Sequence, residues 1–269
     1  RPGEKPTLAS CPVHEPADWA AIGERPHDGG ALGEQIEAVT LLRRALPGLP
    51  LLPTVFTPLA VLAELVETPG ELREHMRTHP DIVRRALEAV TATFERFVPA
   101  LIAAGADGIY LATTDWASRD LMSPEEYAHW ARPGDLRLLA AVRGAPFNVL
   151  HVCKRRNLLF ELADYPVSAF SWDATDPTNP SLAQGLARLP GAVMGGISQE
   201  GALLDADPGR AIAEFHGGLE LTRGRRWLVG PGCSIPPSAT ATTLAALATT
   251  IRNTRIADHR PTGSSNQER

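Results

Sequence analysis

Six short apolar runs recur along the chain, and a longer segment with a different spacing of apolar residues follows each of them. Short continuous apolar runs bounded by turn residues are typical of strands that are buried on both faces of a parallel sheet. We therefore predict six strands. Their ranges are Leu51–Phe56, Gly108–Ala112, Phe147–Val152, Val167–Trp172, Ala192–Ile197 and Trp227–Val229.

The segments between these runs have the spacing of amphipathic helices. In the longest of them, Ile82, Ala86, Val90, Phe94 and Val98 lie three or four residues apart, so they share one helix face that packs on the sheet. Strands that alternate with helices indicate parallel strands joined by helical crossovers, because a parallel pair needs a long return connection. The pattern predicts an α/β fold.

Two helix starts carry recognisable capping residues. Ser123 precedes Pro124, and Glu126 completes a capping box; Asp207 precedes Pro208 in the same manner. Residues 1–30 are irregular, apart from a helical turn expected over Pro16–Ile22.

A parallel sheet of this kind is either an open doubly wound sheet or a closed barrel. The turn after Phe56 contains no glycine-rich phosphate-binding motif, which favours the barrel. Six strands are too few for an eight-stranded cylinder, so we expect a (β/α)8 TIM barrel that lacks its first two strands in this chain. The domain is predicted over residues 1–252, and residues 253–269 are expected to form a disordered polar tail.

The composition narrows the range of functions. The 269 residues include 26 Lys and Arg against 31 Asp and Glu, a net charge of −5, so no basic surface for nucleic acid is expected. Only three cysteines are present, and neither a signal peptide nor an apolar run long enough for a membrane span is evident. We expect a cytoplasmic enzyme with no nucleic-acid or membrane partner.

A candidate metal site combines one histidine and two cysteines. His151 and Cys153 point to the same side of their strand because side chains alternate, and Cys233 follows the last strand at the same rim. Imidazole and thiolate are ligands that Zn²⁺ prefers, and three protein ligands leave a fourth position for water or substrate. The alternative is that all three are ordinary buried residues. Cys11, in the irregular start, is expected to take no part.

Further candidates lie on the loops at the same rim. Asp115 could act as a proton donor, an electrostatic anchor or a fourth metal ligand, although capping of the following turn is an equal alternative. Arginines there could bind a carboxylate, sulfonate or phosphate, unless the loop is merely solvated. The predicted substrate-binding residues are Trp116, Arg119, Arg155, Arg156, Trp172 and Asp173.

These residues resemble the uroporphyrinogen decarboxylase superfamily of (β/α)8 barrels, which includes the haem-pathway decarboxylase and cobamide-dependent methyltransferases. The resemblance extends over nearly all of Leu51–Arg252. It is carried by Asp115-Trp116-Ala117, Leu121–Tyr127, His151-Val152-Cys153, Phe170–Asp173, Gly195-Gly196-Ile197 and Gly232–Pro237. The methyltransferase branch has a His-x-Cys and a distant Cys that bind zinc and activate a thiol such as coenzyme M, and His151, Cys153 and Cys233 match this pattern.

The chain also departs from both branches. Cys233 stands where the decarboxylases have the histidine of a Gly-His-Gly-Ile motif, and Leu51–Leu65 lacks their tyrosine. The arginine and aspartate that they use from the first two barrel strands are also missing from this chain. Lys154 replaces the glycine that follows His-x-Cys in the methyltransferases, and Ser238-Ala239-Thr240 replaces their Asp-Thr-Pro.

Three functions follow from the resemblance. The first is zinc-dependent transfer of a methyl group from a methylcobamide, carried by a corrinoid protein, to a small-molecule thiol. The second is decarboxylation of a tetrapyrrole without a cofactor, in which Arg119, Arg155 or Arg156 would bind its carboxylates. The third is binding of a corrinoid or tetrapyrrole without catalysis.

Overall fold

The computed structural model describes residues 10–254, which form one parallel sheet with helices packed beside it. The strands lie in the order β1-β2-β3-β4-β5-β6, and every neighbouring pair is parallel. Their bounds are Thr54–Phe56 for β1, Tyr110–Ala112 for β2, Val149–His151 for β3, Ala169–Ser171 for β4, Ala192–Ile197 for β5 and Trp227–Pro231 for β6. All six predicted strands are present. Strand β5 has its predicted bounds and β6 continues two residues beyond its prediction, whereas β1 to β4 begin two or three residues later than predicted and β3 and β4 also end one residue earlier.

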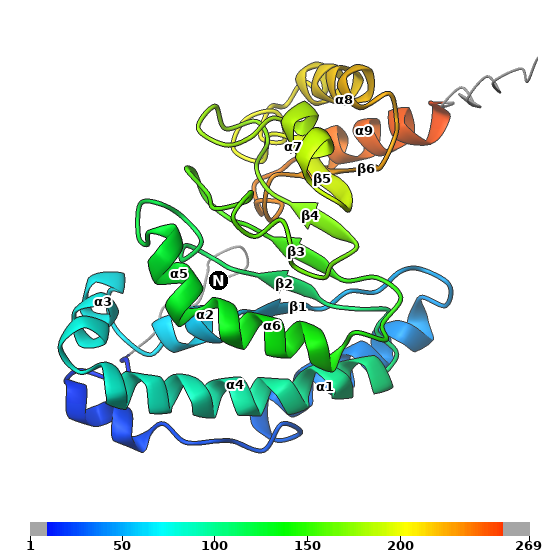
Figure 1. Cartoon of the computed structure of the whole chain (residues 1–269). Helices are drawn as coiled ribbons and strands as arrows, with labels where there is room; N and C mark the ends of the chain where they lie inside the picture. Colours follow the sequence, from blue (N-terminus) through cyan, green and yellow to red (C-terminus); the bar gives the residue numbers. More distant parts are fainter. Residues whose placement is uncertain (1–9, 255–269) are drawn as a thin grey trace, which may run out of the picture.

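Helices fill the connections between strands except the one from β3 to β4, where residues 152–168 form bends and turns instead of the expected helical segment (Figure 1). A 3-10 helix η1 (Pro16–Ala21) and α1 (Gly30–Ala45) precede the sheet. The remaining helices are α2 (Pro58–Ala63), α3 (Pro69–Thr78), α4 (Pro80–Ala103), α5 (Pro124–Trp130), α6 (Arg132–Ala141), α7 (Leu182–Arg188), α8 (Gly209–Thr222) and α9 (Ala241–Asn253). Figure 1 shows α1, α2, α4 and α6 beside the β1–β2 end of the sheet, and α7, α8 and α9 beside the β5–β6 end.

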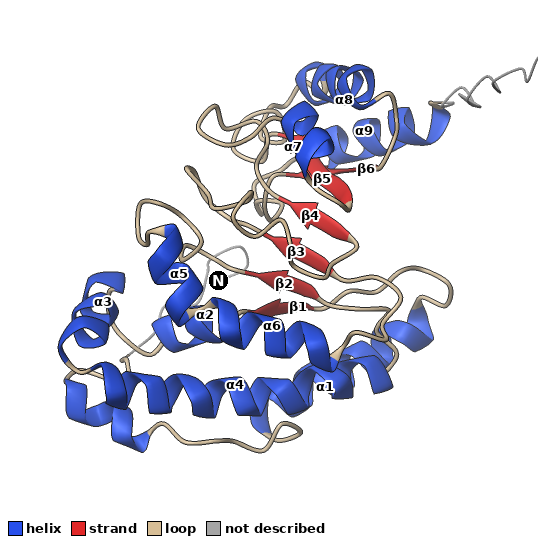
Figure 2. Ribbon diagram, viewed as in Figure 1, coloured by secondary structure: helices blue, strands red, loops and turns tan. Residues whose placement is uncertain are grey.

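This sheet is an arc of a (β/α)8 barrel (Figure 2). Within residues 10–254, β1 and β6 are each paired on one side only, so the arc is not closed there into a cylinder. Side chains at these two edges remain accessible, with Phe56 44% and Leu228 38% exposed. Strand order and direction therefore agree with the predicted barrel class.

Helix starts follow the predicted capping chemistry with one correction. Ser123 Oγ accepts a hydrogen bond from the Glu126 backbone nitrogen, and Glu126 reciprocates, so this capping box is confirmed. Helix α8 begins at Gly209, with Pro208 rather than Asp207 at its N-cap position; Asp207 Oδ1 accepts a hydrogen bond from the Gly209 nitrogen at 2.9 Å. The expected polar tail falls almost entirely outside the described residues, and α9 continues to Asn253.

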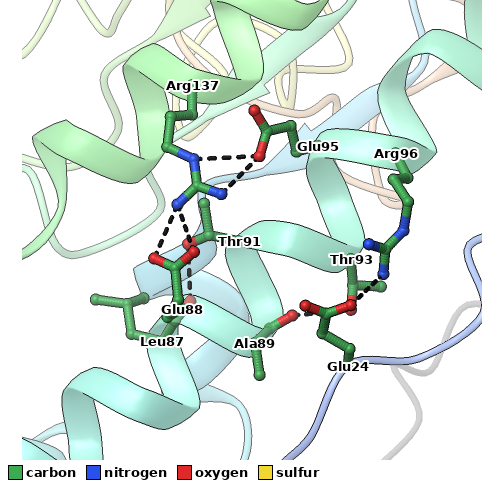
Figure 3. Close-up of polar contacts among 9 residues, drawn as sticks. All are labelled: Glu24, Leu87, Glu88, Ala89, Thr91, Thr93, Glu95, Arg96 and Arg137. Carbon is green, nitrogen blue, oxygen red and sulfur yellow. Dashed lines mark hydrogen bonds and ion pairs between the residues drawn. The ribbon is translucent and has the colours of Figure 1, made fainter.

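A surface ion network joins two of the helices (Figure 3). Arg137 of α6 lies between Glu88 and Glu95 of α4, with Nη1 2.7 Å from Glu88 Oε1 and Nη2 2.6 Å from Glu95 Oε2. Arg96 of α4 pairs with Glu24 at 2.7 Å, which attaches the segment after η1 to the same helix. The apolar faces of α4 and α6 supply most of the packing energy, since exposed ion pairs contribute about 0–1 kcal/mol each.

Candidate metal centre

His151, Cys153 and Cys233 meet at the carboxyl end of the sheet. One ligand atom from each lies within 4.8 Å of the others, and the two Sγ atoms are 3.6 Å apart. His151 is the last residue of β3, and Cys153 follows it by two positions on the same side of the chain. The prediction that these three residues converge is thus met by the geometry.

Gly232 allows Cys233, which follows β6, to approach Cys153, which follows β3. Strands β3 and β6 are separated by two strands, which in a flat sheet would place them about 14 Å apart. The sheet curves, and the segment after β6 passes closely over the end of β4. A Cβ at Gly232 would lie 2.6 Å from Asp173 Cα and 2.6 Å from Gln199 Oε1, so only glycine permits this approach.

The two cysteines share a proton in this arrangement. A hydrogen bond from the Cys153 thiol lowers the pKa of Cys233 well below its usual range, and the nearby His151 lowers it further. The same hydrogen bond, with burial and the charge of Cys233, raises the pKa of Cys153. The proton is therefore held by Cys153 in preference to Cys233, and the two thiols titrate as a coupled pair.

His151 is buried, and its two ring nitrogens differ. Nδ1 is 3.2 Å from Ser171 Oγ, whereas Nε2 has no hydrogen-bond partner within the described part of the chain. Ser171 Oγ in turn lies 2.8 Å from the hydroxyl of Tyr110. Burial raises the pKa of Tyr110 to about 12, so this hydroxyl is protonated at neutral pH.

The predicted site residue Asp115 forms an ion pair with a lysine that was not predicted to belong to the site. Asp115, at the exit of β2, lies 3.3 Å from Lys154 Nζ, and both side chains are about half exposed. Lys154 directly follows Cys153 and has a left-handed backbone, with φ of 65°. Asn179 holds it there by donating to its carbonyl oxygen at 2.9 Å. The pair brings a cation and a carboxylate next to the cysteine cluster.

The three predicted arginines are paired with acidic side chains. Arg119 contacts Glu161, while Arg155 and Arg156 both contact Asp120, at 3.2 and 2.8 Å. They are exposed, so they remain accessible to a ligand, but an incoming anion would have to replace an existing carboxylate partner.

The two tryptophans require a correction. Trp116 is 2% exposed, although it borders a cavity beside Asp115, and Trp172 is 0% exposed, so the two indoles are held in the core and do not project from the rim. Trp172 packs on α7, and its indole nitrogen donates to the Pro180 carbonyl at 2.6 Å. Both belong to the core that supports the rim.

Asp173 accepts hydrogen bonds from its own loop and from the loop after β5. Its Oδ1 accepts from Thr175, and its Oδ2 accepts from Gln199 Nε2 at 2.9 Å.

Four further residues surround the cluster and were not predicted as site residues from the sequence: Tyr110, Ser171, Gly232 and Gln199. Cys11, predicted to take no part, lines a cavity of about 410 Å³ together with Asp115, Glu64 and Glu67.

The sequence matches a known protein family and a curated relative. A family model described as "Uroporphyrinogen decarboxylase (URO-D)" matches residues 1–254. The chain belongs to this family. A protein of Roseiflexus sp. (strain RS-1) named "Uroporphyrinogen decarboxylase" is 31% identical over 148 residues, which are 52% of this chain. The matched segment spans 41% of the length of that relative.

Solved structures share the fold of this URO-D family chain. A methyltransferase from Methanosarcina mazei superposes with a TM-score of 0.72 at 24% identity, covering 85% of this chain and 69% of its own. A B12-independent methionine synthase from Shewanella sp. W3-18-1 gives a TM-score of 0.59 at 13% identity, covering 81% of this chain and 66% of its own.

No helix between residues 10 and 254 combines the length and apolarity that a membrane span requires.

Proposed function

We propose that His151, Cys153 and Cys233 bind Zn²⁺ and that this URO-D family protein uses the centre to methylate a thiol. The observation that carries the proposal is the convergence of one imidazole and two sulfurs within 4.8 Å. Two thiolates on a tetrahedral zinc, at about 2.3 Å each, would lie about 3.8 Å apart. The observed separation of 3.6 Å needs almost no adjustment.

The state of His151 also suits a metal ligand. A nitrogen that coordinates a metal must carry a lone pair, and the opposite ring nitrogen normally donates a hydrogen bond that fixes the ring. Ser171 can accept from Nδ1, which leaves the buried Nε2 as the free acceptor. A buried nitrogen without a partner costs free energy, so a cation at this position would satisfy it.

Zinc supplies one chemical capability in such a site, because a thiol that occupies its fourth position loses its proton near neutral pH. The residues of this chain would do the rest. Cys153 and Cys233 contribute two negative charges, which suit a metal that holds a nucleophile. Asp115, which contacts Lys154 next to Cys153, would accept the thiol proton.

The methyl donor and acceptor are assigned by class. We propose a methylated corrinoid, delivered by a partner protein, as donor and a small thiol such as coenzyme M as acceptor. Support comes from the fold shared with the Methanosarcina methyltransferase and from the family pattern that the three ligands match. We further propose that the protein acts in the cytoplasm.

A second candidate is decarboxylation of a tetrapyrrole, which the name of the Roseiflexus relative favours. Its carboxylates would bind Arg119, Arg155 or Arg156. The pairing of these arginines with Glu161 and Asp120 makes such binding less favourable. Cys233 also offers a thiol where the decarboxylases have histidine. We therefore rank methyl transfer first.

The experiment combines metal analysis with two assays. Wild-type protein should hold about one zinc ion per chain, Cys153→Ala and Cys233→Ala should lose it, and the control Cys11→Ala should retain it. Methylcobalamin and coenzyme M should then yield methylated thiol only with the zinc-loaded forms. Conversion of uroporphyrinogen by zinc-free protein would support the second candidate. Corrinoid binding without turnover would indicate a binding protein.

A further inference from the structure

Three neighbouring strands contribute one residue each to a buried polar chain behind His151. Tyr110 comes from β2, His151 from β3 and Ser171 from β4. In the sheet register His151 lies opposite Ser171, while Tyr110 lies opposite Val149, two residues earlier. These positions therefore project on the same face of the sheet. Ser171 is fully buried and His151 is 4% exposed, so solvent does not compete for the contacts.

The hydrogen bonds of this chain select one form of the imidazole. Ser171 Oγ can accept two hydrogen bonds and donate one. Its neighbours are His151 Nδ1 at 3.2 Å and the Tyr110 hydroxyl at 2.8 Å. With the proton on Nδ1, the imidazole donates to Ser171, and Nε2 keeps its lone pair. With the proton on Nε2, the N–H could donate only toward the Cys233 sulfur among the described residues, and Nε2 would have no lone pair for a metal ion.

Aromatic stacking fixes the plane of the same ring. The Tyr110 and His151 rings are stacked, with centroids 5.3 Å apart and an interplanar angle of 24°. Rotation of the imidazole about its Cβ–Cγ bond would break both the stack and the bond to Ser171. Tyr110 therefore holds the orientation of His151 in two ways, directly through its ring and indirectly through its hydroxyl.

We infer that Ser171 and Tyr110 are positioning residues that hold His151 as the Nδ1–H tautomer with Nε2 available to a metal ion. This inference rests on the proposed zinc site and adds to it the residues that set its affinity. Mutation of a residue that hydrogen-bonds a metal-binding histidine typically weakens metal binding 10- to 100-fold. We expect an effect of this size when Ser171 is replaced.

The test measures zinc affinity by competition with a chromophoric chelator, using zinc alone as the probe. Ser171→Ala removes the acceptor and should weaken zinc binding about 10- to 100-fold. Tyr110→Phe keeps the stacked ring and removes the hydroxyl, so its loss should be smaller than that of Ser171→Ala. Ser171→Thr retains a hydroxyl and should restore much of the affinity.

Thr113→Val is the matched control. Thr113 is buried, and its hydroxyl donates to the His151 backbone carbonyl at 3.2 Å, whereas the ring nitrogen Nδ1 is paired with Ser171. This variant should bind zinc as the wild type does. A general loss of packing would affect it as much as Ser171→Ala, whereas loss of imidazole positioning would not.

A second readout needs no metal and separates this inference from the proposed function. Nitrogen-15 chemical shifts of His151 in metal-free protein report which ring nitrogen carries the proton. We expect Nδ1–H in the wild type and a mixed population in Ser171→Ala. An unchanged tautomer and unchanged zinc affinity in Ser171→Ala would overturn the inference. A wild type that binds no zinc but shows the Nδ1–H tautomer lost in Ser171→Ala would overturn the proposed function alone.

Discussion

A buried carboxyl far from the proposed metal makes the stability of this protein depend on pH. Asp135 of α6 is 0% exposed, and its Oδ2 accepts hydrogen bonds from Tyr127 at 2.8 Å and Tyr165 at 2.9 Å. Its Oδ1 has no partner among residues 10–254. Burial raises the pKa of Asp135 from 3.8 to about 7, and the bonds from Tyr127 and Tyr165 oppose the rise only in part.

The sign and the size of the effect follow from this shift. Between pH 3.8 and about 7 the folded protein holds a proton on Asp135 that the unfolded chain has released. The free energy of unfolding therefore falls as the pH rises through this window. Three pKa units correspond to on the order of 4 kcal/mol. The contribution is fully present below the unfolded pKa and is lost above the folded one.

The variant Asp135→Asn isolates this contribution, because an amide resembles the protonated carboxyl and does not titrate. Urea unfolding of the variant and the wild type should be measured at intervals from pH 4 to pH 8. The difference in free energy of unfolding should move in favour of the variant as the pH rises, by on the order of 4 kcal/mol across the range. The exposed Asp164, whose pKa is lowered by Arg132, provides the control Asp164→Asn, which should not show this change. Parallel profiles, or a difference that moves the other way, would show that Asp135 is ionised throughout and refute the reasoning.

Three further substitutions test the packing, the capping and the surface charges. Gly185→Ala would place a Cβ 2.4 Å from the ring of Trp172, which is buried and cannot move away. Urea unfolding should show that the free energy of unfolding falls by about 1–3 kcal/mol. The control Gly144→Ala, whose Cβ would meet no atom within 4 Å, should lower it far less. Ser123→Ala removes the side-chain cap of α5 and should lower the free energy of unfolding by about 1 kcal/mol; an unchanged value would mean that the cap is replaced by solvent. Arg137→Met breaks the ion network between α4 and α6 and should lower the free energy of unfolding by about 0–1 kcal/mol at low salt, with no difference at high salt. A loss that does not depend on salt would indicate that the aliphatic part of the Arg137 side chain stabilises the protein by packing.

The strands and the convergence of His151, Cys153 and Cys233 can be predicted from the sequence because both depend on local pattern and on one general rule. Alternation along the predicted strand puts His151 and Cys153 on one side, and in the structure Cys153 follows the end of β3 by two residues. The meeting of parallel strand ends at one rim places Cys233 near them. Neither inference requires knowledge of a particular side-chain contact, so both follow from the sequence alone.

Other parts of the site could not be predicted because they depend on register and on packing between loops. Ser171 and Tyr110 belong to the site only because β2, β3 and β4 pair in the observed register. Trp172 was misplaced, although alternation from Ser171 would have turned it away from the site and toward α7. The carboxylate partners of the arginines come from other loops, and nothing in a linear pattern pairs Asp120 with Arg156.

The most direct test of the account is the set of atoms that bind zinc in this protein. X-ray absorption at the zinc edge should show two sulfurs at about 2.3 Å and a nitrogen at about 2.0–2.1 Å in the loaded wild type. Cys233→Ser should show one sulfur fewer and the control Cys11→Ser should show the wild-type spectrum. A shell of oxygen and nitrogen alone, or a sulfur count that Cys233→Ser leaves unchanged, would contradict a centre formed by His151, Cys153 and Cys233.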